Sequence, residues 1–401
     1  MAPLLALGGD YWWGWGNLLF RWLHVVAAIA WIGSSFYFIA LDNHLRPPVD
    51  EADAERGVGG EAWEIHGGGF YQVQKYRVAP RTLPEPLYWF KWEAYTTWLS
   101  GFALLIVLYY VNANTYLIDK SVADLRPWQA IAISVALLGA AWLVYDGLCR
   151  LIPNDLALAA VLLVLVTLAA WGVSHLFSGR AEYIQIGAML GTMMAGNVLF
   201  VIIPAHWELV RAKQAGREPD PAPGIRAKQR SVHNNYLTLP VLFAMLSNHF
   251  PSTYGHSYSW LILMALMVIG AWIRHFFNLR HAGRTVWAIP VTAALAIAGV
   301  AVAIRPNEGG GAAAAGPVSF SRVHAIVEQR CVPCHSAHPT KVAVAPKGVV
   351  FDTPAQIKSQ ASLIESFAVT TKTMPIGNAT GMTQAERDQL GAWIRAGASI
   401  K

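Results

Sequence analysis

The stretch Cys331-Val332-Pro333-Cys334-His335 decides how the rest of the chain is interpreted. C-x-x-C-H is the signature of c-type haem attachment, in which two thiols form thioethers with haem and the histidine ligates the iron. The chain has three cysteines, too few for the second pair that would complete a tetrahedral zinc site. The motif therefore predicts haem c bound covalently to Cys331 and Cys334, with His335 as an axial ligand.

A glycine- and alanine-rich linker at 306–316 precedes a predicted small cytochrome c domain, residues 317–401. We expect a helix from Val323 to Arg330 that runs directly into the haem motif. Thr383-Gln384-Ala385-Glu386 has the pattern of a capping box, which predicts a C-terminal helix that continues through Ala396.

Two methionines between these helices are candidates for the sixth iron ligand. Met374 lies in a loop that the following Pro375 keeps extended, whereas Met382 adjoins the capped helix and is expected to pack there. We predict Met374 as the ligand. A methionine paired with His335 would raise the reduction potential and favour electron acceptance.

Composition predicts that residues 1–305 lie in a membrane. The chain is 55% hydrophobic and 13% charged, whereas soluble proteins contain about 25% charged residues. A bilayer is crossed by about 20 apolar residues, and the candidate windows are 18–41, 93–112, 127–149, 156–177, 183–204, 233–250, 258–277 and 286–305. The predicted fold class is all-α, a polytopic membrane helix bundle of about eight spans followed by a small all-α class I-type cytochrome c domain.

Basic residues support one orientation of these spans. Because c-type haem is attached outside the cytoplasm and the number of spans is even, both termini are predicted to lie outside. The loops then predicted to face inward hold sixteen basic residues, against five in the outward loops before the linker. The inward set is Arg46, Arg56, Lys75, Arg77, Arg81, Lys91, Arg150, Arg211, Lys213, Arg217, Arg226, Lys228, Arg230, Arg274, Arg280 and Arg284. This bias follows the positive-inside rule, so the net charge of +6 predicts contact with a lipid bilayer and requires no nucleic acid.

Histidines at membrane depth are candidate cofactor ligands. In the predicted topology His24, in the first span, and His249, at the end of the sixth, both lie near the outer face. They could ligate a b-type haem that passes electrons to haem c. His175 lies near the same face and is the competing ligand. Each histidine could instead only hydrogen-bond a neighbouring helix.

A second group of polar residues gathers at the inner ends of the spans. Imidazoles, amides and cations together suit a planar anion with several hydrogen-bond acceptors. The glycine run after His66 suggests close approach of the backbone to a ligand. An unrelated scatter of loop residues is the alternative. The group comprises His66, Lys75, Arg77, His206, His233, Asn234, Asn235, Arg274 and His275.

Four stretches carry a specific resemblance to the bacterial membrane-bound urate hydroxylases: Arg21–Phe36, His66–Tyr71, Gly187–Pro204 and Lys228–Phe243. That family joins a multi-span urate oxidase domain to a C-terminal cytochrome c, and the resemblance extends over almost the whole chain. It implies oxidation of urate to 5-hydroxyisourate, with water as the oxygen source. It also implies a bacterial inner membrane protein with a periplasmic cytochrome c domain. Electrons would pass to a soluble cytochrome c or a terminal oxidase.

If urate is the substrate, one of His66, His233 and Lys75 is the expected catalytic base. The anion would be bound by Arg77, Asn234, Asn235, Arg274 and His275. A non-enzymatic module that relays electrons from quinol or a partner subunit to haem c is the alternative function, and a porphyrin-handling membrane protein is a third. The glycine run after His66 favours the enzyme, because a relay has no use for a small-molecule site. The sequence specifies no oligomeric state.

Overall fold

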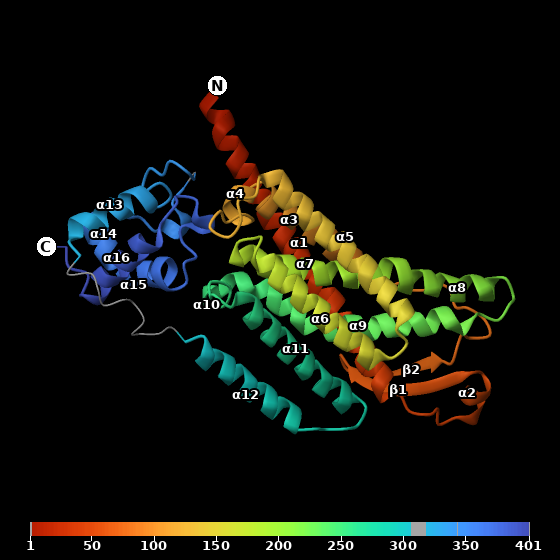
Figure 1. Cartoon of the computed structure of the whole chain (residues 1–401). Coiled ribbons are helices and arrows are strands. Elements are labelled where there is room, and N and C mark those ends of the chain that lie inside the picture. The colour runs from red at the N-terminus through yellow and green to blue at the C-terminus, as the bar shows by residue number, and fades with distance from the viewer. Residues whose placement is uncertain (1, 306–317, 343, 401) are drawn as a thin grey trace.

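A computed structural model describes residues 2–305, 318–342 and 344–400. The predicted linker 306–316, and residue 317 at the start of the predicted cytochrome c domain, lie outside the described residues. The described chain is mostly helical and has two large hydrophobic cores, one within the first 305 residues and one within the C-terminal unit, and a small cluster of Ala94, Val198 and Ile203. Figure 1 shows a long helical bundle with the C-terminal unit near one end and a β-hairpin near the other.

Every predicted membrane window contains a helix. The helices are α1 (Ala2–His44), α3 (Trp92–Leu105) with the π-helix η1 (Ile106–Tyr110), α5 (Pro127–Leu151), α6 (Asp155–Ser174), α7 (Gly179–Asn197) with the π-helix η2 (Val198–Ile202) and α8 (Ile203–Gln214), α9 (Pro221–Leu246), α11 (Ser259–His281) and α12 (Ala288–Ala303). Short helices α2 (Glu51–Glu55), α4 (Ala113–Tyr116), η3 (Ser247–His249) and α10 (Pro251–Tyr254) lie in the connections.

Five helices of the described chain are long and apolar enough to cross a membrane, fewer than the eight windows predicted. They are Trp12–His44, Pro127–Leu151, Asp155–Ser174, Gly179–Gln214 and Ser259–His281. The helix α12 is apolar but has only 16 residues. The helix α9 is long enough, but its residues 221–235 carry three cations and three polar residues of the predicted inner cluster. The count of eight spans stays a prediction.

Residues 58–76 form a β-hairpin, which the all-α prediction lacked. Strand β1 (Val58–His66) pairs antiparallel with β2 (Gly69–Tyr76). Gly67 and Gly68 connect the strands with φ angles of 56° and 84°. A two-residue hairpin turn with positive φ at both positions strongly favours glycine. The glycine run is therefore explained by turn geometry and needs no bound ligand.

The bundle is built around α7, which is the most buried long helix. It packs against α5, α6 and α9, and α9 in turn packs against α11. The core between these helices contains Tyr145, Phe177, Tyr183, Leu190 and Leu263. The outward faces of α1, α5, α6 and α12 expose large apolar side chains, among them Ile29, Leu143, Leu165 and Leu295. An apolar surface this extensive is expected of a protein surrounded by lipid.

The C-terminal unit consists of short helices around a small core. These are α13 (Phe320–Arg330), η4 (Pro346–Gly348), α14 (Pro354–Ser359), α15 (Ala361–Ile364), the π-helix η5 (Glu365–Thr370), η6 (Ile376–Asn378) and α16 (Gln384–Arg395). The predicted helix before the haem motif is confirmed as part of α13. The predicted capping box is confirmed as well: Thr383 N–H donates to Glu386 Oε2 at 2.7 Å, and Thr383 Oγ1 accepts from Glu386 N–H.

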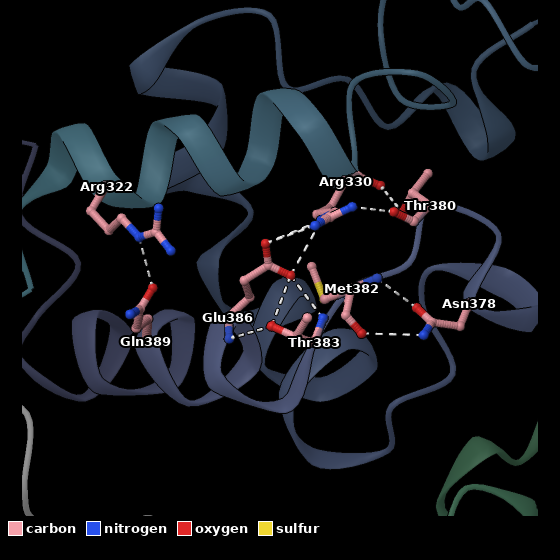
Figure 2. A network of polar contacts seen from close by, with 8 residues as sticks. All are labelled: Arg322, Arg330, Asn378, Thr380, Met382, Thr383, Glu386 and Gln389. Atoms are coloured by element: carbon pink, nitrogen blue, oxygen red, sulfur yellow. Dashed lines mark hydrogen bonds and ion pairs between the residues drawn. The ribbon is translucent and has the colours of Figure 1, made fainter. Parts of the chain in front are cut away.

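Arg330, the last residue of α13, ties the haem motif to α16 (Figure 2). Its guanidinium lies 3.0 Å from Glu386 Oε1, and its carbonyl accepts from Thr380 Oγ1 at 2.9 Å. Asn378 Oδ1 accepts from Met382 N–H at 2.8 Å, which closes the loop of residues 378–382 that contains Thr380 (Figure 2). The residue before Cys331 is thus fixed relative to the loop that follows Met374.

The Glu386 carboxylate should stabilise the C-terminal unit only above acidic pH. Burial raises its pKa, but hydrogen bonds from Thr383 and Arg330 outweigh this and hold the pKa below the ordinary value of 4.5. A depressed pKa means that the stabilisation is present above 4.5 and is lost as the pH falls through the folded-state value. Glu386→Gln, which keeps the capping box but removes the charge, should cost about 1 kcal/mol at neutral pH.

Amide exchange of α16 in the full chain measures this cost. The difference between Glu386→Gln and the parent protein should shrink as the pH falls well below 4.5. Asp388→Asn is the control, because Asp388 is an exposed carboxylate on the same helix. A Glu386→Gln effect that is independent of pH would contradict the role of the charge.

Candidate functional site

The middle of α9 divides the predicted polar cluster between two faces. Tyr145 Oη lies 2.9 Å from His233 Nδ1, so His233 faces α5. Arg274 Nε donates to Asn235 Oδ1 at 2.9 Å, so Asn235 faces α11. Consecutive helical residues point about 100° apart, which puts positions 233 and 235 on nearly opposite sides of α9. The sequence predicted one cluster, and the structure has two.

The first cluster joins α5, α7 and α9 through buried amides. Asn197 Nδ2 donates to Tyr145 Oη and to Asn234 Oδ1, each at 2.9 Å, and Asn234 Nδ2 donates to Met194 O at 3.0 Å. Asn197 is the last residue of α7 before the π-helix η2. Insertions of π-helix often accompany functional sites. Here the π-helix follows directly on the asparagine that connects three helices.

A buried ion pair adjoins this cluster. Arg230 is 3% exposed, and its Nη2 lies 2.8 Å from Asp146 Oδ1. The guanidinium also lies 4.9 Å from the centroid of the Tyr145 ring. Arg150, on the exposed side, binds the other carboxylate oxygen of Asp146 at 2.7 Å. Since its charge is compensated and its donors have partners, Arg230 has a structural role here.

The second cluster leaves buried donors without partners. Arg274 is 4% exposed and Asn235 is fully buried, and the guanidinium lies 4.0 Å from the centroid of the Phe36 ring on α1. Arg274 Nη2 and Asn235 Nδ2 have no hydrogen-bond partner among the described residues. A buried unsatisfied donor costs about 1–3 kcal/mol, and more when it is charged. Both donors would be satisfied by a ligand that offers acceptor atoms.

Two further residues on the same face of α11 also have buried polar atoms without a hydrogen-bond partner among the described residues. Asn278 and His281 follow Arg274 at i+4 and i+7, so all three lie along one stripe of the helix. Within the described part of the chain, Asn278 Oδ1 and His281 Nδ1 are also buried atoms without a partner. We call Arg274, Asn278 and His281, together with Asn235 on the facing helix α9, the α11 polar face. It presents two donors, one acceptor and one imidazole nitrogen.

Asn278 and His281 were not among the predicted site residues, although the sequence holds a signal for them. Arg274, Asn278 and His281 recur with helical spacing among the polar residues that end an apolar span. That spacing predicts a single polar stripe facing other helices rather than lipid. The predicted site stopped at His275, which instead lies beside Tyr236, with Nδ1 2.7 Å from the tyrosine hydroxyl.

The remaining predicted inner residues lie apart from the α11 polar face. His66 is exposed at the tip of the hairpin, and Arg77 is exposed just after β2. Lys75 forms an ion pair with Asp42 at 2.5 Å, near the C-terminal end of α1. His206, on α8, lies against Trp89 with ring centroids 6.4 Å apart.

The three histidines predicted as b-type haem ligands lie in different settings. His24 packs between α1 and α3, and its Nδ1 lies 2.9 Å from Thr97 O. His175 is exposed at the end of α6, with Nδ1 2.7 Å from Trp171 O. Because a carbonyl only accepts, Nδ1 carries the proton in both, which leaves Nε2 available for a metal. His249 is exposed at the end of η3.

The residues of the C-x-x-C-H motif fit a c-type haem. His335 Nδ1 lies 3.0 Å from Val349 O, so Nδ1–H donates and Nε2 is available to ligate iron. Cys331 and Cys334 are both free thiols. Met374 is partly buried against the same core as Cys331, whereas Met382 is 3% exposed and belongs to that core. Burial raises the pKa of Cys331 to about 12, so the thiol is neutral and unlike a reactive thiolate.

A family model described as Urate oxidase N-terminal matches residues 10–305. The chain belongs to this family. The match runs from within α1 through α12, includes both clusters beside α9, and ends before the C-x-x-C-H unit. Membership indicates an oxidoreductase of urate-related chemistry. Comparison with curated proteins and with solved structures gave no match.

The buried ion pair of the first cluster can be tested against its exposed neighbour. Asp146→Asn would leave the buried Arg230 charge uncompensated and should destabilise the protein by about 3–5 kcal/mol. Arg150→Gln removes a partner whose side chain is 70% exposed, and should cost less than about 1 kcal/mol. Thermal unfolding of the detergent-solubilised protein compares the two variants. Equal losses would contradict a structural role for the Arg230–Asp146 pair.

Proposed function

We propose that the protein is a membrane-bound urate hydroxylase that oxidises urate to 5-hydroxyisourate and passes the electrons to its own cytochrome c domain. One observation carries the proposal: a urate oxidase family region and a haem-attachment motif share one chain. The acceptor beyond haem c would be a soluble cytochrome c or a terminal oxidase. The cytochrome c domain would lie on the periplasmic side of a bacterial inner membrane.

We assign urate binding to the α11 polar face. Urate is a planar anion that offers carbonyl oxygens as acceptors and ring N–H groups as donors. Arg274 Nη2 and Asn235 Nδ2 would donate to the acceptors, and Asn278 Oδ1 would accept from a ring N–H. Hydrogen bonds to a charged group are roughly twice as strong as neutral ones, which suits Arg274 to an anion.

The reaction releases two protons and two electrons while the oxygen of water bonds to C5 of urate. We propose His281 as the proton acceptor, because its Nδ1 lies on the α11 polar face without a partner among the described residues. The bases predicted from the sequence fit less well. His66 is at an exposed turn, Lys75 is paired with Asp42, and His233 faces the other cluster.

Haem would supply the one-electron acceptors that this oxidation requires. Cys331, Cys334 and His335 would hold haem c, with Met374 as the sixth ligand. His24 with His249 or His175 would hold a b-type haem nearer the substrate. The alternative function, a relay from quinol or a partner subunit, gives no role to the four unpartnered atoms of the α11 polar face.

Urate added without oxygen to membranes that contain the protein tests the proposed function. The reduced spectrum of a c-type haem should appear, and isotopically labelled water should place its oxygen in the product. No reduction by urate, together with ready reduction by quinol, would favour the relay instead. A pyridine haemochrome count would also show whether a b-type haem is present.

Substitution of Arg274 tests the binding site. Arg274→Gln removes the charge and should raise the KM for urate roughly 10- to 100-fold, the loss expected for a charge-assisted hydrogen bond. Arg280→Gln is the control, because Arg280 is an exposed cation on the same helix. If both variants keep the parent KM, urate binds elsewhere.

Four variants together identify the base. His281→Ala should lower kcat by about 10²–10⁴-fold, the contribution of a positioned general base, and should leave the haem spectra intact. His66→Ala, His233→Ala and Lys75→Ala should each retain more activity than His281→Ala. Loss in His233→Ala with full activity in His281→Ala would place the base on the other face of α9. Full activity in all four variants would exclude each of them as the base.

A further inference from the structure

The C-terminal unit contacts the bundle through the loop that contains Met374. We call residues 371–378 the Met374 loop. A Cβ atom on Gly377 would lie 2.7 Å from Thr115 O and 2.9 Å from Ile118 O, so this backbone lies directly on the chain around α4. On the other side of Met374, a Cβ on Gly255 would collide with Thr371 O. Figure 1 shows α4 and α10 at the end of the bundle that faces the C-terminal unit.

These two contacts flank the predicted haem ligand. Thr371 lies three residues before Met374 and Gly377 lies three residues after it. The loop between them is also fixed to α16 of the C-terminal unit, because Arg387 Nη1 donates to Met374 O at 2.7 Å. The edge of the C-terminal unit that carries Met374 is therefore the edge that meets the bundle.

The surface that receives Gly377 is anchored in the bundle. We call residues 113–118 the α4 platform. Ser178, the N-cap of α7, donates its N–H to Leu117 O at 3.0 Å and its hydroxyl to Tyr116 O at 2.8 Å. The α4 platform is therefore hydrogen-bonded to the start of α7, the most buried helix of the bundle.

An aromatic pair leads from the α4 platform toward His249. The ring centroids of Tyr116 and Tyr109 lie 6.3 Å apart. Tyr109 is 4% exposed and lies in the π-helix η1, and its hydroxyl accepts from Asn248 Nδ2 at 3.1 Å. Asn248 precedes His249 in the chain. Hydrogen bonds and ring contacts thus run without a break from the neighbour of His249 to the α4 platform.

We propose that the Met374 loop is the docking edge of the C-terminal unit and that electrons enter haem c across its contact with the α4 platform. Each transfer would take one electron from a b-type haem held by the bundle and deliver it to haem c held by Cys331, Cys334 and His335. Tyr109 and Tyr116 connect Asn248 with the α4 platform on this route. The electron route rests on the proposed function. The docking edge rests on the contacts alone.

Two glycines of the C-terminal unit provide a matched comparison. Gly377 and Gly381 both have positive φ, 57° and 66°, so alanine brings similar backbone strain at either position. Only at Gly377 does the new Cβ meet the bundle. At Gly381 its nearest neighbour is Arg330 Nη1, at 3.7 Å. Gly255→Ala approaches the contact from the bundle side with an ordinary φ of −86°, but its Cβ would also lie 2.8 Å from Pro251 O, so the Gly377 and Gly381 pair is the matched comparison.

Amide exchange of the full chain in lipid nanodiscs tests the docking edge. Gly377→Ala and Gly255→Ala should each speed exchange in the α4 platform and the Met374 loop roughly tenfold, which corresponds to about 1.4 kcal/mol of docking free energy. Gly381→Ala should exchange like the parent protein in the α4 platform. If Gly377→Ala and Gly381→Ala exchange alike there, the proposed docking edge is wrong.

The electron route is tested separately by reduction of haem c. Urate should reduce haem c at least roughly tenfold more slowly in Gly377→Ala than in Gly381→Ala, a loss equivalent to about 1.4 kcal/mol. Ascorbate, which reaches haem c from solvent, should reduce both variants equally. Faster exchange with an unchanged urate rate would overturn the route. Failure of urate to reduce haem c in the parent protein would overturn the proposed function and leave the exchange result to judge the docking edge.

Discussion

The rotation of α9 about its own axis is the constraint on which both polar clusters depend. Arg230, on one side of α9, binds Asp146 of α5, and Asn235, on another side, binds Arg274 of α11. A buried ion pair that loses one partner leaves an uncompensated charge at a cost of about 3–5 kcal/mol. Because a turn of α9 in either direction would break one of these contacts, the helix has one acceptable orientation between α7 and α11.

The two buried arginines beside α9 differ in how completely they are satisfied. Arg230 is paired with a carboxylate and packs on the Tyr145 ring, so its charge is compensated within the protein. Arg274 packs on the Phe36 ring but has an amide as its partner, and one of its nitrogens has none among the described residues. The same residue type at similar burial is structural in one cluster and open to an anion in the other. Charge balance distinguishes the two more clearly than position in the sequence.

Local patterns in the sequence predicted local structure well. The apolar windows became helices, and the capping box at Thr383 opened α16, because periodicity and capping depend on residues close in the chain. The predicted substrate site was divided between two faces of α9. The sequence grouped residues by predicted depth in the membrane, but depth does not say which face of α9 each side chain occupies. The β-hairpin was missed because Gly67 and Gly68 were interpreted as a binding loop, although two consecutive glycines between strands are a turn signal.

The continuous helix from Gly179 to Gln214 also limits how deeply the bundle can sit in a bilayer. Its 36 residues extend about 54 Å at 1.5 Å per residue, whereas the hydrocarbon core of a bilayer is about 30 Å thick. If α7 crosses that core, α8 stands clear of it. Near that exit, the rings of Trp89 and Trp207 lie 4.5 Å apart, and Lys91 Nζ lies 5.5 Å from the Trp89 centroid. Paired tryptophans beside a cation are typical of the level of lipid headgroups, so this contact would set how deeply the bundle sits.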